Sequence, residues 1–152
     1  NGETFEQNAL IKAETVMRET GLPVLADDSG LAVDALDGAP GVHSARYAGA
    51  HGDDQANNDL LLQNMQGVVE RQCKFVCAMA LALPGQETRI VRGECEGRLL
   101  TALEGEGGFG YDPLFLYESG KTFGQMTAEE KNQVSHRFHA VEKMREVLRE
   151  LF

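Results

Sequence analysis

The hydrophobic residues recur with helical spacing near the two ends of the chain and alternate in the manner of strands in its middle. From Thr4 to Glu19 the apolar residues fall three and four positions apart, which is the helical period. Thr4 and Gln7 have the spacing of a capping box, and Gly21 is typical of a helix end. The pattern therefore predicts an amphipathic helix over residues 4–19.

The clearest strand pattern covers residues 72–84, where bulky side chains alternate with small or polar ones. Its small residues, Ala78, Ala80 and Ala82, indicate that a helix packs closely on that face. We expect further strands at 24–26, 31–36, 88–95 and 98–103.

Helices are predicted over residues 53–65, from Thr127 onward with Glu130 completing a capping box, and at the C-terminal end. This order of elements is typical of an α/β or α+β fold with a mixed sheet and flanking helices.

Composition and charge narrow the class of protein. The 152 residues carry 42% hydrophobic and 25% charged residues, as ordinary globular domains do. A net charge of −10 argues against a surface for nucleic acid polymers. No run approaches the ~20 apolar residues of a membrane span, and there is no signal peptide pattern. The three cysteines form no paired motif, so we expect free thiols and a cytoplasmic, reducing compartment.

Adjacent carboxylates, Asp27 and Asp28, interrupt two apolar runs in "VLADDSGLAV". One interpretation is a turn, since Asp, Ser and Gly favour turns. The other is a cation site, because two neighbouring like charges repel unless a cation offsets them. Mg²⁺ commonly takes one or two carboxylates together with phosphate oxygens of a substrate. The pattern leaves both interpretations open.

A glycine-rich segment, "GEGGFGYDP", covers residues 105–113. It matches neither a Walker loop nor a dinucleotide fingerprint, and a mobile hairpin is the simpler interpretation. However, Phe109 and Tyr111 are aromatic side chains that can stack on a base, and Asp112 can accept hydrogen bonds from a base edge.

A third segment, "EEKNQVSHRF", groups Lys131, His136 and Arg137. Lysine and arginine bind phosphates, and this group is either a phosphate or base site or a solvated helix end. The remaining histidines, His43, His51 and His139, show no ligand spacing and are interpreted as surface or structural residues.

Together these segments resemble the inosine triphosphate pyrophosphatase family. The resemblance rests on "FEQNALIKA", "ADDSGL", "GAPGVHSARYAG", "GGFGYDP" and "EEKNQVSHR" in this order, and covers nearly the whole chain. It implies an α/β fold with a mixed twisted sheet and two lobes around a central cleft. It also implies a homodimer, Mg²⁺ as cofactor, and release of pyrophosphate from purine nucleoside triphosphates such as ITP, dITP and XTP.

The resemblance also assigns roles to residues. It implies that Asp28 binds Mg²⁺ and activates water, and that Lys131 contacts a phosphate. Asp27 would add to the local negative field. Selectivity against ATP would come from pairing with the 6-oxo group of the base. The further substrate-binding residues that it implies are Ser29, Phe109, Gly110, Tyr111, Asp112, His136 and Arg137.

Two departures from the family pattern shape the expectations. Family members begin with a strand and a Thr/Ser-x-Asn-x-x-Lys phosphate loop, whereas residues 1–152 read as a single domain without that segment. The metal-binding Glu of the pattern Phe-x-Glu-Asn-Ala falls here on Gln7, which brings no charge, so weaker Mg²⁺ binding is expected. The alternative interpretation is a truncated nucleotide-binding or dimerisation module that does not hydrolyse its ligand.

Overall fold

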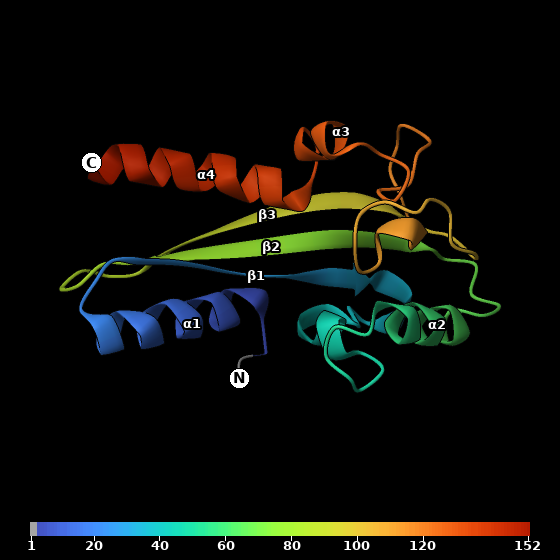
Figure 1. The fold of residues 1–152 in the computed structure, drawn as a ribbon, viewed down its shortest axis with the longest axis horizontal. Coiled ribbons are helices and arrows are strands. Elements are labelled where there is room, and N and C mark those ends of the chain that lie inside the picture. Colours follow the sequence, from blue (N-terminus) through green and yellow to red (C-terminus); the bar gives the residue numbers. More distant parts are fainter. Residues whose placement is uncertain (1–2) are drawn as a thin grey trace.

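The protein folds around one long sheet with helices on both of its faces (Figure 1). This computed structural model describes residues 3–152. The described helices and strands are α1 (Phe5–Thr20), β1 (Val24–Val33), α2 (Asp54–Asn64), β2 (Gln72–Ala82), β3 (Arg89–Leu99), β4 (Phe115–Leu116), α3 (Ala128–Asn132) and α4 (His136–Leu151), with 3-10 turns at Asp34–Leu36, Gly41–Arg46 and Asp112–Leu114.

The four strands lie in the order β1-β2-β3-β4. The predicted α/β class with flanking helices is confirmed. In one respect the sheet differs from the mixed sheet that was expected, because every strand pairing among residues 3–152 is antiparallel. The strands are also longer than predicted. The two runs on either side of Asp27 and Asp28 join into the single strand β1, and the two runs between 88 and 103 join into β3.

The alternation along β2 gives each face of the sheet its own helix. The small residues Ala78, Ala80 and Ala82 pack against α1, as the sequence predicted. The bulkier Met79 and Leu81 face the opposite side and pack against α4. Figure 1 shows α1 and α4 on opposite sides of the strands. The sheet is thus covered on both faces along one end of its length.

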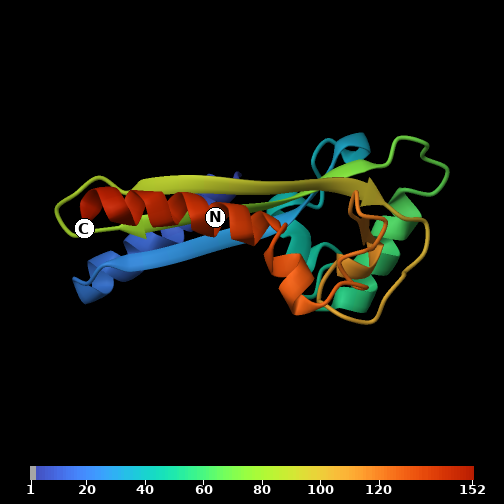
Figure 2. The same cartoon turned by 90° about the horizontal axis from the view of Figure 1, so that it is seen from above.

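A third hydrophobic cluster occupies the other end of the sheet, where α2 and the segments that follow β3 lie. Figure 2 shows these elements gathered at that end. Phe75, Phe115 and Phe123 form its centre, with the rings of Phe75 and Phe115 4.5 Å apart. The described core thus consists of three clusters, one on each face at one end of the sheet and this one at the other end.

Local capping follows the sequence signals closely. Thr4 and Gln7 form the predicted capping box of α1, and Thr127 and Glu130 form that of α3. The cap of α4 was not predicted: the Ser135 hydroxyl accepts from Phe138 N at 3.1 Å. This cap makes His136 and Arg137 the first two residues of α4, so the backbone that positions both side chains is helical.

The three cysteines are free and buried. Burial raises the pKa of Cys73 and of Cys95 to about 12, so both thiols stay protonated at neutral pH. All three are core residues, and their free state agrees with the free thiols that the sequence predicted. No helix among residues 3–152 is long and apolar enough to cross a membrane.

Candidate active site

The two adjacent aspartates lie in the middle of β1, paired with Met79 and Ala78 of β2. The turn interpretation is therefore wrong: the chain does not reverse here, because antiparallel pairing with β2 holds all ten residues of β1 extended. Successive side chains of a strand point to opposite faces. Asp27 and Asp28 are accordingly separated by the sheet rather than gathered around one cation.

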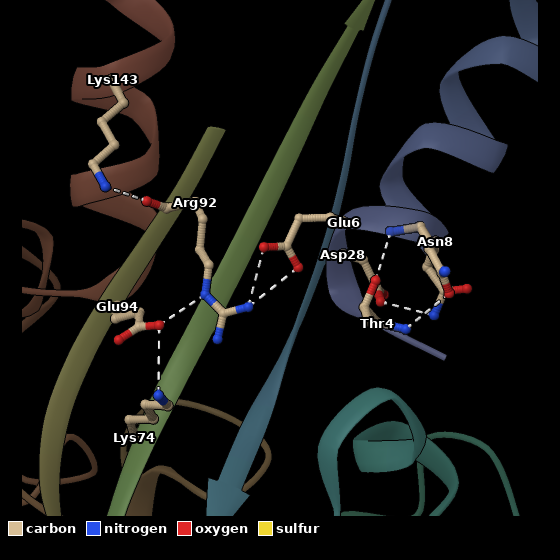
Figure 3. A network of polar contacts seen from close by, with 9 residues as sticks. Thr4, Glu6, Asn8, Asp28, Lys74, Arg92, Glu94 and Lys143 are labelled. Atoms are coloured by element: carbon tan, nitrogen blue, oxygen red, sulfur yellow. Dashed lines mark hydrogen bonds and ion pairs between the residues drawn. The ribbon is translucent and has the colours of Figure 1, made fainter. Parts of the chain in front are cut away.

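Asp28 faces α1 and is held by two of its side chains. Asn8 Nδ2 donates to Asp28 Oδ2 at 3.1 Å, and Lys12 Nζ lies 3.3 Å from Asp28 Oδ1. Figure 3 shows Asn8 reaching from α1 toward Asp28. Lys12 also donates to the backbone oxygen of Asp27 at 3.0 Å. Asn8 and Lys12 were not predicted as site residues, although both lie in "FEQNALIKA" on one side of α1.

Asp27 faces α4 and pairs with Arg137. Arg137 Nη1 donates to Asp27 Oδ2 at 2.8 Å, and the Cys77 thiol lies 4.0 Å from the same oxygen. Two residues that the sequence grouped with different segments are thereby joined across 110 positions of the chain.

A cavity of about 170 Å³ lies between β1, the glycine-rich segment and the start of α4. Two of its lining residues carry buried polar atoms without a hydrogen-bond partner, Ser29 Oγ and His136 Nδ1. Buried polar atoms are normally paired, so a polar ligand that entered the cavity would supply the missing hydrogen bonds. The cavity is lined by Ser29, Gly30, Ser44, Ala45, Asp54, Asn57, Phe75, Phe109, Gly110, Tyr111, Asp112, His136 and Arg137.

The glycine-rich segment lies in the connection between the antiparallel strands β3 and β4, and side-chain contacts hold it in a turn. Asp112 Oδ2 accepts from Phe109 N at 3.0 Å and from Lys131 Nζ. The Lys131 ammonium also lies 4.4 Å from the centre of the Phe109 ring. Gly108 needs its positive φ of 73° here, and a Cβ on it would meet the Asp112 carboxylate. These contacts leave the Phe109 ring 69% exposed beside the cavity.

Tyr111 and Gly110 are tied to neighbouring elements. The Tyr111 hydroxyl donates to Ser44 O at 2.7 Å, and burial raises the pKa of this phenol. Gly110 N donates to Asp54 Oδ2 at 2.9 Å, and Gly110 O accepts from Asn58 at 3.0 Å. The two residues line the cavity while anchoring the turn.

His136 is buried and stacks on Phe75, with ring centres 4.9 Å apart. Burial, followed by the charges of Arg137 and Lys131, lowers the pKa of His136 to about 3. The imidazole is therefore neutral at physiological pH, with one nitrogen donating and the other accepting.

A second cavity, of about 300 Å³, adjoins the first through Ser29 and Ala45, which line both. Asp28 and Lys12 line it, together with His43, Arg46 and His51. Arg46 Nη2 lies 3.1 Å from His43 Nδ1. From the sequence, His43 and His51 were interpreted as surface or structural residues. The i, i+3 spacing of His43 and Arg46, which places both on one side of a 3-10 turn, is the signal that could have indicated this pair.

Gln7, the expected metal ligand, has a different partner in this structure. Its Oε1 accepts from Glu3 N at 2.7 Å and from Thr4 N at 3.3 Å. An amide has only one such oxygen, so the capping box occupies the atom that a cation would need. Asn8, the next residue, contacts Asp28 instead. Among residues 3–152 no three His, Cys, Asp or Glu side chains are grouped so that they could hold a metal ion.

Comparison with known proteins shows the family of this chain. Residues 1–147 match the Ham1 family. The chain belongs to the Ham1 family. Among curated relatives, the dITP/XTP pyrophosphatase of Geobacillus kaustophilus is 51% identical, over 99% of this chain and 75% of that protein. The dITP/XTP pyrophosphatase of Streptomyces coelicolor is 52% identical, over 99% of this chain and 76% of that protein.

Solved Ham1 structures share the whole fold. The Staphylococcus aureus Ham1 protein superimposes with a TM-score of 0.97 at 40% identity, over 100% of this chain and 80% of that one. A nucleoside-triphosphatase described as a dITP/XTP pyrophosphatase, from Mycobacterium abscessus, gives a TM-score of 0.85 at 47% identity, over 95% of this chain and 75% of that one. The family identified from the sequence segments is thereby confirmed, and this Ham1 chain spans about three quarters of the length of such relatives.

Proposed function

We propose that this protein hydrolyses non-standard purine nucleoside triphosphates, namely ITP, dITP and XTP, to the nucleoside monophosphate and pyrophosphate. The observation that carries the proposal is the pair of unpaired buried atoms, Ser29 Oγ and His136 Nδ1, in a cavity that opens beside Asp28. A purine nucleotide offers polar atoms for these groups and phosphates for the neighbouring cationic cavity. The curated relatives named above are dITP/XTP pyrophosphatases.

The first cavity is the proposed site of the base. The exposed Phe109 ring offers a stacking surface, and the neutral His136 offers a donor and an acceptor. Arg137 adds N–H donors that suit a 6-oxo group, which inosine and xanthine carry where adenine has an amine. Lys131 and Asp112 support the Phe109 turn through their mutual contact. The phosphate contact expected of Lys131 stays a prediction.

The second cavity is the proposed site of the phosphates. Lys12 and Arg46 supply cationic side chains there, and His43 and His51 add ring nitrogens. Cationic groups of this kind stabilise the negative charge that develops on a leaving pyrophosphate.

Asp28 is the proposed catalytic residue and lines the second cavity. Its carboxylate accepts a proton from water while the water oxygen bonds to the α-phosphorus. The bond from that phosphorus to the bridging oxygen breaks, and pyrophosphate leaves with its electron pair. Asn8 and Lys12 orient the carboxylate from α1.

Mg²⁺ is the proposed cofactor. A carboxylate next to a phosphate site fits this ion, which takes one or two carboxylates plus substrate phosphates. Asp28 would hold it, with Gln7 as a weaker second ligand once its oxygen leaves the cap. When bound, the ion offsets triphosphate charge and polarises the phosphorus centre.

We further propose that the chain forms one domain and acts as a cytoplasmic homodimer. The continuous sheet and the three free, buried thiols support a single domain in a reducing compartment. Light scattering at micromolar concentration measures the assembly.

The function is tested by pyrophosphate release with Mg²⁺ from ITP, dITP, XTP, ATP and a simple phosphomonoester. We expect turnover of the first three, with kcat/KM at least about 10²-fold above that for ATP, because a site built for one hydrogen-bond pattern strongly rejects another. Equal turnover of ITP and ATP, or turnover of the phosphomonoester alone, contradicts the proposal. Binding of ITP without pyrophosphate release would favour the non-hydrolysing module.

A further inference from the structure

The Asp27–Arg137 pair joins the middle of β1 to the first turn of α4, beside the cavity proposed for the base. We propose that Asp27 is a positioning residue, which holds Arg137 toward this cavity and thereby sets the preference for 6-oxopurines over adenine. This inference rests on the proposed function. It gives the two adjacent carboxylates separate tasks: Asp28 serves the phosphates and Asp27 the base.

Neighbouring side chains of β1 point to opposite faces of the sheet, so Asp27 and Asp28 cannot serve the same part of the site. Asp28 shares its face of the sheet with Ala78 and α1, whereas Asp27 shares the opposite face with Met79 and α4. Asp27 therefore cannot turn toward Asn8 and Lys12 without a shift in strand register. Its partner on the α4 face is Arg137, at 2.8 Å.

Arg137 needs such a partner because its own surroundings leave it free to move. Half of its side chain is exposed, and a long exposed arginine samples many rotamers. The neighbouring His136 is fixed by burial and stacking, but Arg137 has no comparable packing. The bond to Asp27 uses one Nη1 donor. A guanidinium carries five N–H donors in a rigid fork, so the others remain for a ligand.

A fixed donor rejects the wrong base, whereas a mobile one does not. The amine of adenine would meet the Arg137 donors with donors of its own, and both would lose their hydrogen bonds. An arginine that swings into solvent avoids this loss and admits adenine. Removing Asp27 should therefore lower activity on ITP and leave activity on ATP the same or higher.

The test compares kcat/KM for ITP and for ATP in wild type, Asp27→Asn and Arg137→Gln. We expect Asp27→Asn to lower the ITP/ATP ratio by about tenfold, the effect of one charge-assisted hydrogen bond. Glu150→Gln is the matched control, because Glu150 pairs with Arg89 at 3.0 Å and so also links a strand to α4, away from the cavity. Its ratio should equal that of wild type.

The double variant Asp27→Asn/Arg137→Gln shows whether Asp27 acts through Arg137. We expect its ratio to equal that of Arg137→Gln alone; a further multiplicative fall overturns the inference. An unchanged ratio in Asp27→Asn overturns it as well. Should Asp27→Asn fail to fold in a thermal melt, Asp27→Ser replaces it, since a small polar residue suits this partly exposed strand position.

Failure of the proposed function can be distinguished from failure of the inference about Asp27. A wild-type chain that releases no pyrophosphate from ITP contradicts that function, and the inference is then decided by binding. Calorimetry with IMP and AMP reports the same base preference without turnover. Loss of the IMP preference in Asp27→Asn supports the inference, and an IMP preference equal to that of wild type overturns it.

Discussion

Lys12 Nζ lies 3.3 Å from Asp28 Oδ1, while Asn8 binds the other oxygen of the same carboxylate. Both oxygens are thus oriented by α1, one turn apart on the helix. The Asp28 side chain is 15% exposed, so it meets solvent only at the edge of the cationic cavity. Its geometry suits a base that receives one water molecule from a single direction.

We predict that Asp28→Asn lowers kcat for ITP by at least about 10²-fold, the usual contribution of a positioned general base. Asparagine keeps the size of the side chain and can still accept from Lys12, so the fold should persist. Pyrophosphate release at saturating Mg²⁺ measures the effect, and circular dichroism checks the fold. Turnover near the wild-type rate would mean that Asp28 is only a structural residue of β1.

Much of the scaffold could be predicted because it depends on local signals. Residues only two to four positions apart determine the capping boxes at Thr4 and Thr127 and the face of β2 with small side chains. All three predictions are confirmed. The turn at Asp27 failed for a physical reason. Asp, Ser and Gly favour turns locally, but pairing with ten residues of β2 overrides that preference.

The site was harder to predict because its contacts are distant in sequence. Ser29, His136 and Arg137 were identified by family resemblance, but no spacing shows that Asp27 pairs with a residue 110 positions away. Arg46 and His51 were missed for the same reason. Their proximity to Lys12 exists only after α1 and the 3-10 turn pack on β1.

The cationic cavity leads to a prediction for product binding. We expect Arg46→Met to weaken inhibition by pyrophosphate by at least about tenfold, since a hydrogen bond between charged groups contributes about 1.5–3 kcal/mol. Inhibition by IMP should change little, because IMP lacks the two phosphates of the leaving group. Arg18→Met is the control: Arg18 is an exposed arginine of α1 that pairs only with Glu14 among the contacts described. Equal loss of both inhibitors would argue for a general effect on the fold.

Gly93 of β3 allows the start of α4 to pack closely on the sheet. This part of α4 carries His136, which lines the cavity proposed for the base. A Cβ at this position would lie 2.3 Å from His136 O and from Ala140 N, which are backbone atoms that cannot move alone. We therefore predict that Gly93→Ala destabilises the protein by about 1–3 kcal/mol, as overpacking does. Chemical denaturation measures the loss.

The same substitution should also weaken IMP binding, because the start of α4 carries His136 and Arg137. Gly85→Ala serves as a comparison at a turn, where a Cβ has open space and only the positive φ of 77° is unfavourable. Stability and IMP binding equal to wild type in Gly93→Ala would contradict this account of the helix contact.

Gln7→Glu tests whether the start of α1 can contribute to a metal site. Gln7 has one acceptor oxygen, and the capping box occupies it. A glutamate can keep that cap with one oxygen and offer the other to a cation, with added charge. We expect the Mg²⁺ concentration for half-maximal activity to fall several-fold, since hard cations prefer charged oxygen ligands. A lower unfolding free energy would show that the cap was lost, and an unchanged Mg²⁺ midpoint would confine residue 7 to capping.

The buried His136 predicts how stability depends on pH. Its folded-state pKa is about 3, whereas an unfolded histidine titrates near 6.5. Between these values the unfolded chain binds the proton and the folded protein does not. Stability from the neutral imidazole is thus fully present above about pH 6.5 and is lost progressively as the pH falls toward 3.

The pH value of 5 lies about 1.5 units below the unfolded-state pKa of His136. Proton binding by the unfolded chain therefore lowers the free energy of unfolding by about 2 kcal/mol at pH 5 relative to pH 8. Urea unfolding at both pH values, in wild type and in His136→Gln, measures this. The variant lacks the titrating ring, and the contributions of all other groups cancel in the difference between the two proteins. We expect wild type to lose about 2 kcal/mol more than His136→Gln on going from pH 8 to pH 5. Equal losses of unfolding free energy in the two proteins would mean that His136 keeps an ordinary pKa. Burial against Phe75 and the charges of Arg137 and Lys131 would then not lower that pKa.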